Sequence, residues 1–280
     1  MLVVIGDLVA DLIVLGGASL ERGTDNPAEV RLTRGGSAAN VAVAAAARHP
    51  VRFIGRVGDD TLGRTLVGEL EAAGVDARVQ RDGRTGLIVV LVDAVGERTM
   101  ITDRGAAAEL DAIDPDWMDG ADWVHLPLYG FATPLSRKAV TDAATRAAAR
   151  GARVSLDLSS VATLRELGAQ HLRTLLADLR PDVVFANEDE ARTAAALGIT
   201  PGGVYVVKRG AEPVVVSADG ESVEVAVDRV DDVRDSTGAG DAFAAGYIVA
   251  ALAGAGPTES ARAGSVLAMQ ALRRPGALSG

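Results

Sequence analysis

The sequence predicts a three-layer α/β/α fold, in which helices cover both faces of a mostly parallel central sheet. Short runs rich in Val, Ile and Phe alternate with longer Ala-rich stretches, which is typical of parallel strands joined by crossover helices. A run such as Val183–Phe185 is apolar at every position, as expected for a strand with both faces covered. A β-rich stretch that breaks this alternation predicts a small second sheet.

The predicted elements follow one another in chain order, beginning with a strand at the N-terminus. Strands are predicted at Leu2–Ile5, Val51–Val57, Val124–Leu126, Val154–Leu158, Val183–Ala186, Val204–Lys208 and Pro213–Ser217. Helices are predicted at roughly Ala38–Arg48, Leu62–Ala73, Pro134–Arg150, Thr163–Leu179, Glu188–Leu197, Ala239–Ala253 and Thr258–Arg273.

Two segments depart from the strand–helix alternation. Residues Gly86–Val92 and Glu97–Asp103 flank Ala94-Val95-Gly96 and are typical of a β-hairpin. The polar segment Ser19–Thr33 interrupts the first strand–helix unit. Because neither a tandem repeat nor a low-complexity linker is visible, we expect one domain over residues 1–280. Residues of about 12–34 and 86–103 would form a small β lid over its mouth.

The composition narrows the possible functions. The chain of 280 residues is 48% hydrophobic and 24% charged, an ordinary globular balance. The lack of cysteine excludes disulfides and thiolate zinc sites, and a net charge of −10 argues against a nucleic-acid partner. No apolar run is long enough to span a membrane, and Met1–Asp7 lacks the basic start of a signal peptide, so we expect a cytoplasmic protein.

The most informative motif is Asp235–Phe243, which reads Asp-Ser-Thr-Gly-Ala-Gly-Asp-Ala-Phe and continues as a helix. A glycine-rich turn that opens a helix binds anions through its free N–H groups and the helix dipole. A carboxylate inside such a turn would repel a phosphate. Asp241 therefore makes more sense as a base that deprotonates an attacking hydroxyl while the Gly238–Asp241 turn stabilises the transferred phosphoryl group. The alternative is an ordinary helix start in which Asp241 complements the dipole.

Two other phosphate-binding motifs do not fit. A dinucleotide-binding fingerprint would need a glycine at the position of Phe243. A Walker-type loop would need a lysine after glycine, and neither of the two lysines, Lys138 and Lys208, follows one.

An early glycine-rich segment is a candidate sugar site. Gly35 and Gly36 let a ligand approach the backbone, and Asn40 follows in the first turns of a helix. Asp11, after the first strand, is suited to bind a pair of sugar hydroxyls. The alternative is a plain loop with Ser37 as the N-cap of the helix.

Further candidates follow two predicted strands in the second half. Asn187 and Glu190 have the spacing of a helix N-cap and its capping box. At the carboxyl end of a strand they could also hold water around Mg²⁺. Lys208, near Gly210, could contact nucleotide phosphate or be a plain charge at a strand end.

Together these segments resemble the ribokinase-like (PfkB) family of carbohydrate kinases. Asp235–Asp241 is similar to the C-terminal signature of that family. The segments Gly35–Asn40 and Phe53–Gly63 are similar to its N-terminal signature, and Asn187–Glu190 to its Asn-x-x-Glu motif. The resemblance covers residue 2 to about residue 277.

The resemblance implies a function and a set of site residues. It implies an ATP-dependent kinase that uses Mg²⁺, phosphorylates a hydroxyl of a small sugar or sugar acid, and forms a homodimer through its lid. It places Asp241 as catalytic base, with Gly238, Ala239 and Gly240 in the anion turn. It implies sugar binding by Asp11, Gly35, Gly36, Asn40 and Arg104, nucleotide binding by Asn187, Lys208, Gly210, Gly238, Gly240 and Ser265, Mg²⁺ binding by Asn187 and Glu190, and a possible K⁺ site at Asp235 and Thr237.

Departures from the family pattern leave the acceptor open. Ser37 occupies the position at which similar ribokinase-type enzymes have lysine. Pro213 occupies a position at which a second glycine is common in the family. A nucleoside kinase of the same fold is therefore an alternative. A sugar- or nucleotide-binding regulator without turnover is another, although a pure binder does not need a base in its anion turn.

Overall fold

The larger sheet of the protein is mostly parallel. The computed structural model describes residues 1–16, 20–93, 98–230 and 237–273, and within these ranges nine strands form one sheet, in the order β13-β12-β11-β10-β9-β8-β1-β4-β5. Pairing is parallel from β11 through to β5, whereas β12 and β13 join antiparallel at one edge. The bounds are β1 Leu2–Ile5, β4 Val51–Val57, β5 Asp76–Arg81, β8 Trp123–Pro127, β9 Arg153–Asp157, β10 Val183–Asn187, β11 Val204–Arg209, β12 Glu212–Ala218 and β13 Glu221–Val225.

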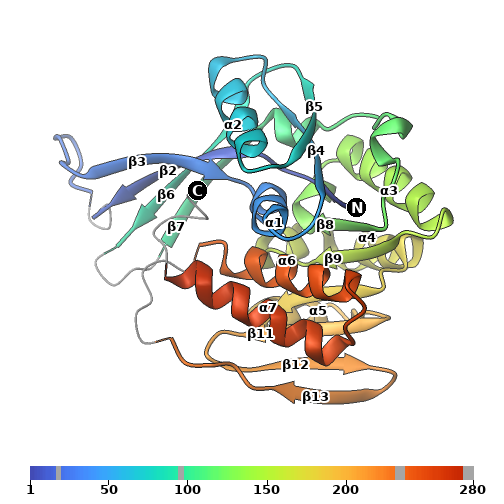
Figure 1. The fold of residues 1–280 in the computed structure, drawn as a ribbon. Helices are drawn as coiled ribbons and strands as arrows, with labels where there is room; N and C mark the ends of the chain where they lie inside the picture. Colours follow the sequence, from blue (N-terminus) through green and yellow to red (C-terminus); the bar gives the residue numbers. More distant parts are fainter. Residues whose placement is uncertain (17–19, 94–97, 231–236, 274–280) are drawn as a thin grey trace.

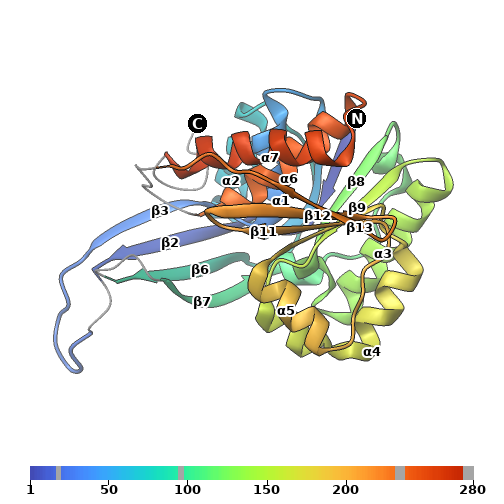
Figure 2. The ribbon, with the colours of Figure 1, turned by 90° about the horizontal axis from the view of Figure 1, so that it is seen from below.

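Helices cover both faces of this sheet, which confirms the predicted three-layer fold (Figures 1 and 2). Each face is sealed by its own buried apolar cluster. One face carries α1 Ser37–Ala46, α2 Thr61–Ala72, α6 Ala239–Leu252 and α7 Pro257–Leu272. The other carries α3 Pro134–Ala149, α4 Val161–Leu179 and α5 Glu188–Ala196. No helix in the described ranges has both the length and the apolar composition needed to cross a membrane.

A smaller sheet extends from the side of the main body, as Figure 2 shows. Its strand order is β3-β2-β6-β7, and the predicted hairpin is present as the antiparallel pair β6 and β7. The turn residues Ala94-Val95-Gly96 lie outside the described residues. The bounds are β2 Val9–Leu15, β3 Glu29–Gly35, β6 Thr85–Val92 and β7 Arg98–Gly105. Strand β2 lies entirely before the predicted segment Ser19–Thr33, and β3 begins within that segment and ends two residues beyond it.

Each predicted strand and helix of the main body is present, with ends that agree to within two residues. The prediction missed two strands, β5 and β13. Both are edge strands, and their sequences, Asp-Ala-Arg-Val-Gln-Arg and Glu-Ser-Val-Glu-Val, are too polar to stand out as buried runs. The long helix α4 is interrupted at Gly168, where φ is 69°.

The topology fixes where a ligand can bind. Strand β1 pairs with β4 on one side and with β8 on the other, so the strand order reverses at β1. In open α/β sheets the crevice at such a switch point, beyond the carboxyl ends of the strands, is the usual binding site. The residues that follow β1, β8, β9 and β10 therefore meet at one edge of the sheet.

An aromatic cluster packs this edge against α6. Phe185 on β10 is fully buried, and its ring centroid lies 5.1 Å from that of Tyr247 and 6.3 Å from that of Phe243. We expect Phe185→Ala to lower the free energy of unfolding by about 3–5 kcal/mol, because it leaves a cavity in a close-packed core. Urea unfolding followed by circular dichroism measures this change. Val266→Ala, at an exposed site on α7, is the matched control, and equal losses in the two variants would contradict the packing account.

Candidate active site

A cavity of about 1020 Å³ lies at the carboxyl ends of the central strands and extends under the smaller sheet. Residues from both halves of the chain line it. They come from the loop after β1 and from β2, β6, β7, α1, β9, β10, β11, the start of α6 and α7, among other segments. The cavity therefore stands at the switch point of the sheet, between the main body and the smaller sheet.

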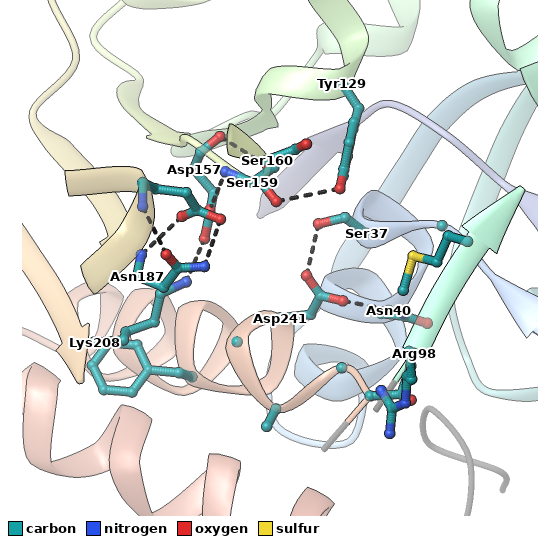
Figure 3. A pocket seen from close by; sticks show the side chains of 18 of the residues that line it. Ser37, Asn40, Arg98, Tyr129, Asp157, Ser159, Ser160, Asn187, Lys208 and Asp241 are labelled. Carbon is teal, nitrogen blue, oxygen red and sulfur yellow. Dashed lines mark hydrogen bonds and ion pairs between the residues drawn. The ribbon is translucent and has the colours of Figure 1, made fainter. Parts of the chain in front are cut away.

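Asp241 lies at the centre of this cavity, in the first turn of α6 (Figure 3). Helix α6 starts after Gly238, whose φ of 74° is left-handed and suits glycine. The Oγ of Ser37 donates to Oδ1 of Asp241 at 2.6 Å, and Nδ2 of Asn40 donates to Oδ2 at 2.9 Å. Burial raises the pKa of Asp241 to about 6, although the bonds from Ser37 and Asn40 act in the opposite direction.

The structure excludes the alternative in which Ser37 caps α1. The N-cap is Gly36, and no side chain caps the helix. Gly36 has φ of 101°, and a Cβ there would collide with the backbone carbonyl of Asp7. The hydroxyl of Ser37 is consequently available to Asp241, which sequence reasoning did not anticipate.

Acidic and basic side chains converge on the side of the cavity near the smaller sheet. Asp11 lies against Gly35, at which any Cβ would overlap its carboxylate. Burial, then the neighbouring Asp7 and Asp241, raise the pKa of Asp11 to about 7. Nη1 of Arg104 lies 3.1 Å from Oδ2 of Asp7, with its guanidinium 4.0 Å from the centroid of the Tyr129 ring.

Sequence reasoning missed Asp7 at this end. It is only 5% exposed and directly follows Gly6, at the end of the buried strand β1. An acidic residue just beyond a buried parallel strand is a signal that could have identified it.

The opposite side of the cavity contains a largely buried ion pair between Lys208 and Asp157. Of these two residues, only Lys208 was predicted from the sequence. Nζ of Lys208 donates to Oδ2 of Asp157 at 2.8 Å, and the backbone N–H of Ser159 donates to Oδ1 of Asp157 at 2.9 Å. Burial opposes the charge on Lys208, but Asp157, Glu190 and Asp241 outweigh it and raise the pKa of Lys208. The ammonium group is therefore held charged among three carboxyl groups.

The predicted capping box at the start of α5 is confirmed. The N–H of Asn187 donates to Oε2 of Glu190 at 2.8 Å, and the N–H of Glu190 donates to Oδ1 of Asn187 at 2.8 Å. Nδ2 of Asn187 also donates to Oε1 of Glu190 at 2.7 Å. Burial, and then Asp157, raise the pKa of Glu190 to about 7.

Most of the predicted site residues meet in the one cavity. Gly35 reaches it only through its contact with Asp11, and Asp235 of the predicted cation site lies outside the described residues. Among the described residues, no group of three or more His, Asp or Glu side chains is arranged to hold a metal ion. The predicted residues that line the cavity are Asp11, Gly36, Asn40, Arg104, Asn187, Glu190, Lys208, Gly210, Thr237, Gly238, Ala239, Gly240, Asp241 and Ser265.

This arrangement combines a base with an anion site. Asp241 is a carboxylate whose pKa allows it to be ionised near neutral pH and still accept a proton. The N-terminus of α6 beside it provides backbone N–H groups for an anionic group. Proton removal and stabilisation of a transferred anionic group can thus occur at one place.

Comparisons with known proteins agree with this chemistry. The model of the pfkB family carbohydrate kinase matches residues 1–280. An ATP-dependent ribose-1-phosphate kinase of Halopiger xanaduensis is 35% identical over 240 residues, which cover 80% of this chain and 76% of that one. A fructokinase of Escherichia coli is 33% identical over 264 residues, which cover 85% of this chain and 83% of that one.

Solved structures share the fold over almost the whole chain. Adenosine kinase from Sinorhizobium meliloti superimposes with a TM-score of 0.84 at 25% identity, covering 98% of this chain and 95% of that one. An uncharacterized sugar kinase from Pyrococcus horikoshii in complex with ATP has a TM-score of 0.84 at 23% identity, covering 99% and 94%.

The hydrogen bond from Ser37 to Asp241 gives a prediction that does not depend on any substrate. We expect Ser37→Ala to raise the pKa of Asp241 by about 1, equivalent to about 1.4 kcal/mol, because the ionised carboxylate loses a donor. Carboxyl ¹³C titration measures it, with the Asp241 signal assigned by its loss in Asp241→Asn. Ser222→Ala on β13 is the control, and an unchanged or lower pKa in Ser37→Ala would contradict this role.

Proposed function

The chain belongs to the pfkB family of carbohydrate kinases, and we propose that Asp241 is the general base with which it phosphorylates a hydroxyl of a small sugar-like acceptor. The observation that carries the proposal is the position of Asp241, a half-buried carboxylate in the first turn of α6. Ser37 and Asn40 hold both of its oxygens, so the base is oriented before an acceptor arrives.

The transfer step follows from this geometry. The acceptor hydroxyl gives its proton to Asp241 while its oxygen forms a bond to the γ-phosphorus of ATP. The bond between that phosphorus and the oxygen bridging to the β-phosphate breaks, and ADP leaves. The N–H groups of Ala239, Gly240 and Asp241 stabilise the charge on the transferred group.

We place the nucleotide on the side of Lys208 and the acceptor on the side of Asp11. A Cβ on Gly240 would lie 3.3 Å from Nζ of Lys208, so the ammonium borders the anion turn and suits a phosphate. Gly210 and Ser265 also line the cavity and would border the nucleotide.

The oxygen donors near Lys208 fit a hydrated Mg²⁺. Glu190 and Asp157 are buried carboxyl groups. Burial first, and then the charge of Asp157, raise the pKa of Glu190, and a cation would offset both effects. Because both oxygens of Glu190 already accept from Asn187, contact through water is favoured over direct ligation. When bound, Mg²⁺ supplies charge neutralisation on the phosphates.

We also propose that the smaller sheet is a lid and a dimer contact. Its inner face lines the cavity through Asp11, and its closure would exclude water from the reaction. Its outer face carries a cross-strand row of apolar side chains, of which Leu32 and Ile101 are 58% and 60% exposed. Exposed apolar rows of this kind mark association sites. The row is Leu32, Leu12, Val89 and Ile101.

A nucleoside acceptor is the second candidate, and one observation favours it. The inner face of the smaller sheet bears a second cross-strand row, Ile13, Val90 and Met100, which lines the cavity beyond Asp11. The flat aromatic ring of a nucleobase could pack against this row, whereas a free sugar would leave the row exposed to solvent. Phosphorylation of adenosine in preference to fructose or ribose would select this candidate.

Asp241→Asn tests the base. We expect the variant to fold and to lose about 10²–10⁴ in kcat, the usual contribution of a general base. ADP release with Mg·ATP and a panel of sugars and nucleosides measures it, with Asp59→Asn, at an exposed carboxylate, as control. An unchanged kcat would remove Asp241 from the mechanism. Ligand stabilisation without any ADP release in the unmodified protein would indicate a binding protein instead.

Ile101→Glu tests the dimer contact. We expect the unmodified protein to sediment as a dimer and the variant as a monomer, because a charge would be buried in an apolar contact. Val223→Glu, at an exposed site of β13, should leave the dimer intact. A monomer in the unmodified protein at all concentrations, or a dimer in both variants, would refute the contact.

A further inference from the structure

The side chain of Tyr129 contacts residues on both sides of the cavity. It follows β8 and lines the cavity. The guanidinium of Arg104 lies 4.0 Å from the centroid of its ring, and its hydroxyl donates to the carbonyl oxygen of Ser159 at 3.2 Å (Figure 3). Arg104 is paired with Asp7, on the side where we place the acceptor. Ser159 contacts Asp157, on the side where we place the phosphates.

Ser159 is held in a backbone conformation that serine rarely adopts. Its φ of 57° is in the left-handed region, which is unfavourable for a residue with a Cβ. Two other non-glycine residues in the described ranges have positive φ, Arg180 just after α4 and Asp219 between β12 and β13, and neither lines the cavity. Such strain persists only where surrounding contacts hold it, and it occurs most often at functional sites.

The left-handed turn directs the N–H of Ser159 back to the carboxylate that precedes it. The N–H donates to Oδ1 of Asp157 at 2.9 Å, and Oγ of Ser159 donates to the backbone carbonyl of Asp157, also at 2.9 Å. With Oδ1 held in this way, Oδ2 accepts from Nζ of Lys208 at 2.8 Å. The conformation of Ser159 therefore sets the orientation of the carboxylate that holds Lys208.

Two contacts from the segment after β8 hold Ser159 in this conformation. The N–H of Leu128 donates to its Oγ at 3.2 Å, and the hydroxyl of Tyr129 donates to its carbonyl oxygen. Burial, and then the charge of Asp7, raise the pKa of Tyr129 to about 12, so the hydroxyl remains a donor at neutral pH. A change of Ser159 to negative φ would turn its carbonyl group and break the bond from Tyr129.

The ring of Tyr129 has a second contact, with Arg104. Arg104 belongs to β7 of the smaller sheet, whereas Tyr129 and Asp7 belong to the main body. A cation is attracted to the face of an aromatic ring, so the ring holds the guanidinium while Nη1 lies 3.1 Å from Oδ2 of Asp7. The same residue thus supports a cation that lines the other side of the cavity.

We infer that Tyr129 is a positioning residue that acts on both sides of the reaction through two different parts of its side chain. Its hydroxyl holds Ser159, and through it the ion pair of Asp157 and Lys208, in place for the nucleotide phosphates. Its ring holds Arg104 in place for the acceptor. The inference rests on the proposed kinase function and adds to it one residue that serves both substrates.

Tyr129→Phe tests the hydroxyl, because it keeps the ring. We expect hydrogen exchange of the Ser159 amide, measured by NMR without any ligand, to become about tenfold faster, since one hydrogen bond no longer opposes the strain. The Kd of Mg·ADP, measured by calorimetry, should rise about fivefold or more. Tyr247→Phe removes the same atom from a tyrosine packed against Phe185, and as the matched control it should change neither quantity.

Tyr129→Leu tests the ring. The acceptor is whichever of fructose, ribose and adenosine gives the highest kcat/KM with Mg·ATP. We expect its KM to rise about tenfold in Tyr129→Leu and to stay nearly constant in Tyr129→Phe, because only leucine leaves Arg104 without an aromatic face. Equal increases in the acceptor KM in the two variants would overturn the separate roles, because the hydroxyl would then act on the acceptor itself.

The exchange measurement separates a failure of this inference from a failure of the proposed function. If the unmodified protein binds no Mg·ADP and releases no ADP with any acceptor, the proposed function fails, and exchange at Ser159 still decides the role of the hydroxyl. Faster exchange in Tyr129→Phe than in Tyr247→Phe supports that role, and equal rates overturn it. Circular dichroism spectra that match the unmodified protein show that the variants are folded.

Discussion

The structure of the site depends on one contact between distant parts of the chain. Ser37 and Asn40, in the first turns of α1, donate to the two oxygens of Asp241 in the first turn of α6, across 204 and 201 residues of sequence. The two helices lie side by side on one face of the sheet, and alanines of both, among them Ala38 and Ala245, are fully buried in the same apolar cluster. Small side chains let helix backbones approach closely, so the position of Asp241 is set by helix packing.

The rest of the cavity is organised by charge around this carboxylate. An ion pair lies on each side of it, Lys208 with Asp157 and Arg104 with Asp7. Both pairs are largely buried. Removing only one partner of either pair would lower the stability of the fold, because the other charge would be left buried and unpaired. The two pairs lie on the sides of the cavity where we propose that the phosphate and the acceptor hydroxyls bind. The glycines at 36 and 238 make this possible, because both adopt positive φ where the chain turns into a helix.

The sequence predicted the layers of the fold and the location of the site better than the side-chain contacts within the site. The parallel strands and helices of the main body could be predicted because their apolar runs are long and continuous. The edge strands β5 and β13 could not, since half-exposed strands carry polar residues. Asp241 and the Asn187–Glu190 box were visible as local motifs, whereas Asp7 and Asp157 act through partners about 97 and 51 residues away in sequence. The alternative of Ser37 as a cap was wrong for the same reason, because its partner Asp241 is far along the chain.

The central claim is that Asp241, with a pKa of about 6, must be ionised to accept the proton of the acceptor. The most direct test is the pH dependence of kcat/KM, which reports ionisations of the free enzyme. Because the deprotonated form is the active one, kcat/KM should fall about tenfold per pH unit below about pH 6 and level off above the pKa values of the site. A profile that stays flat from about pH 7 down to about pH 5 would contradict the account.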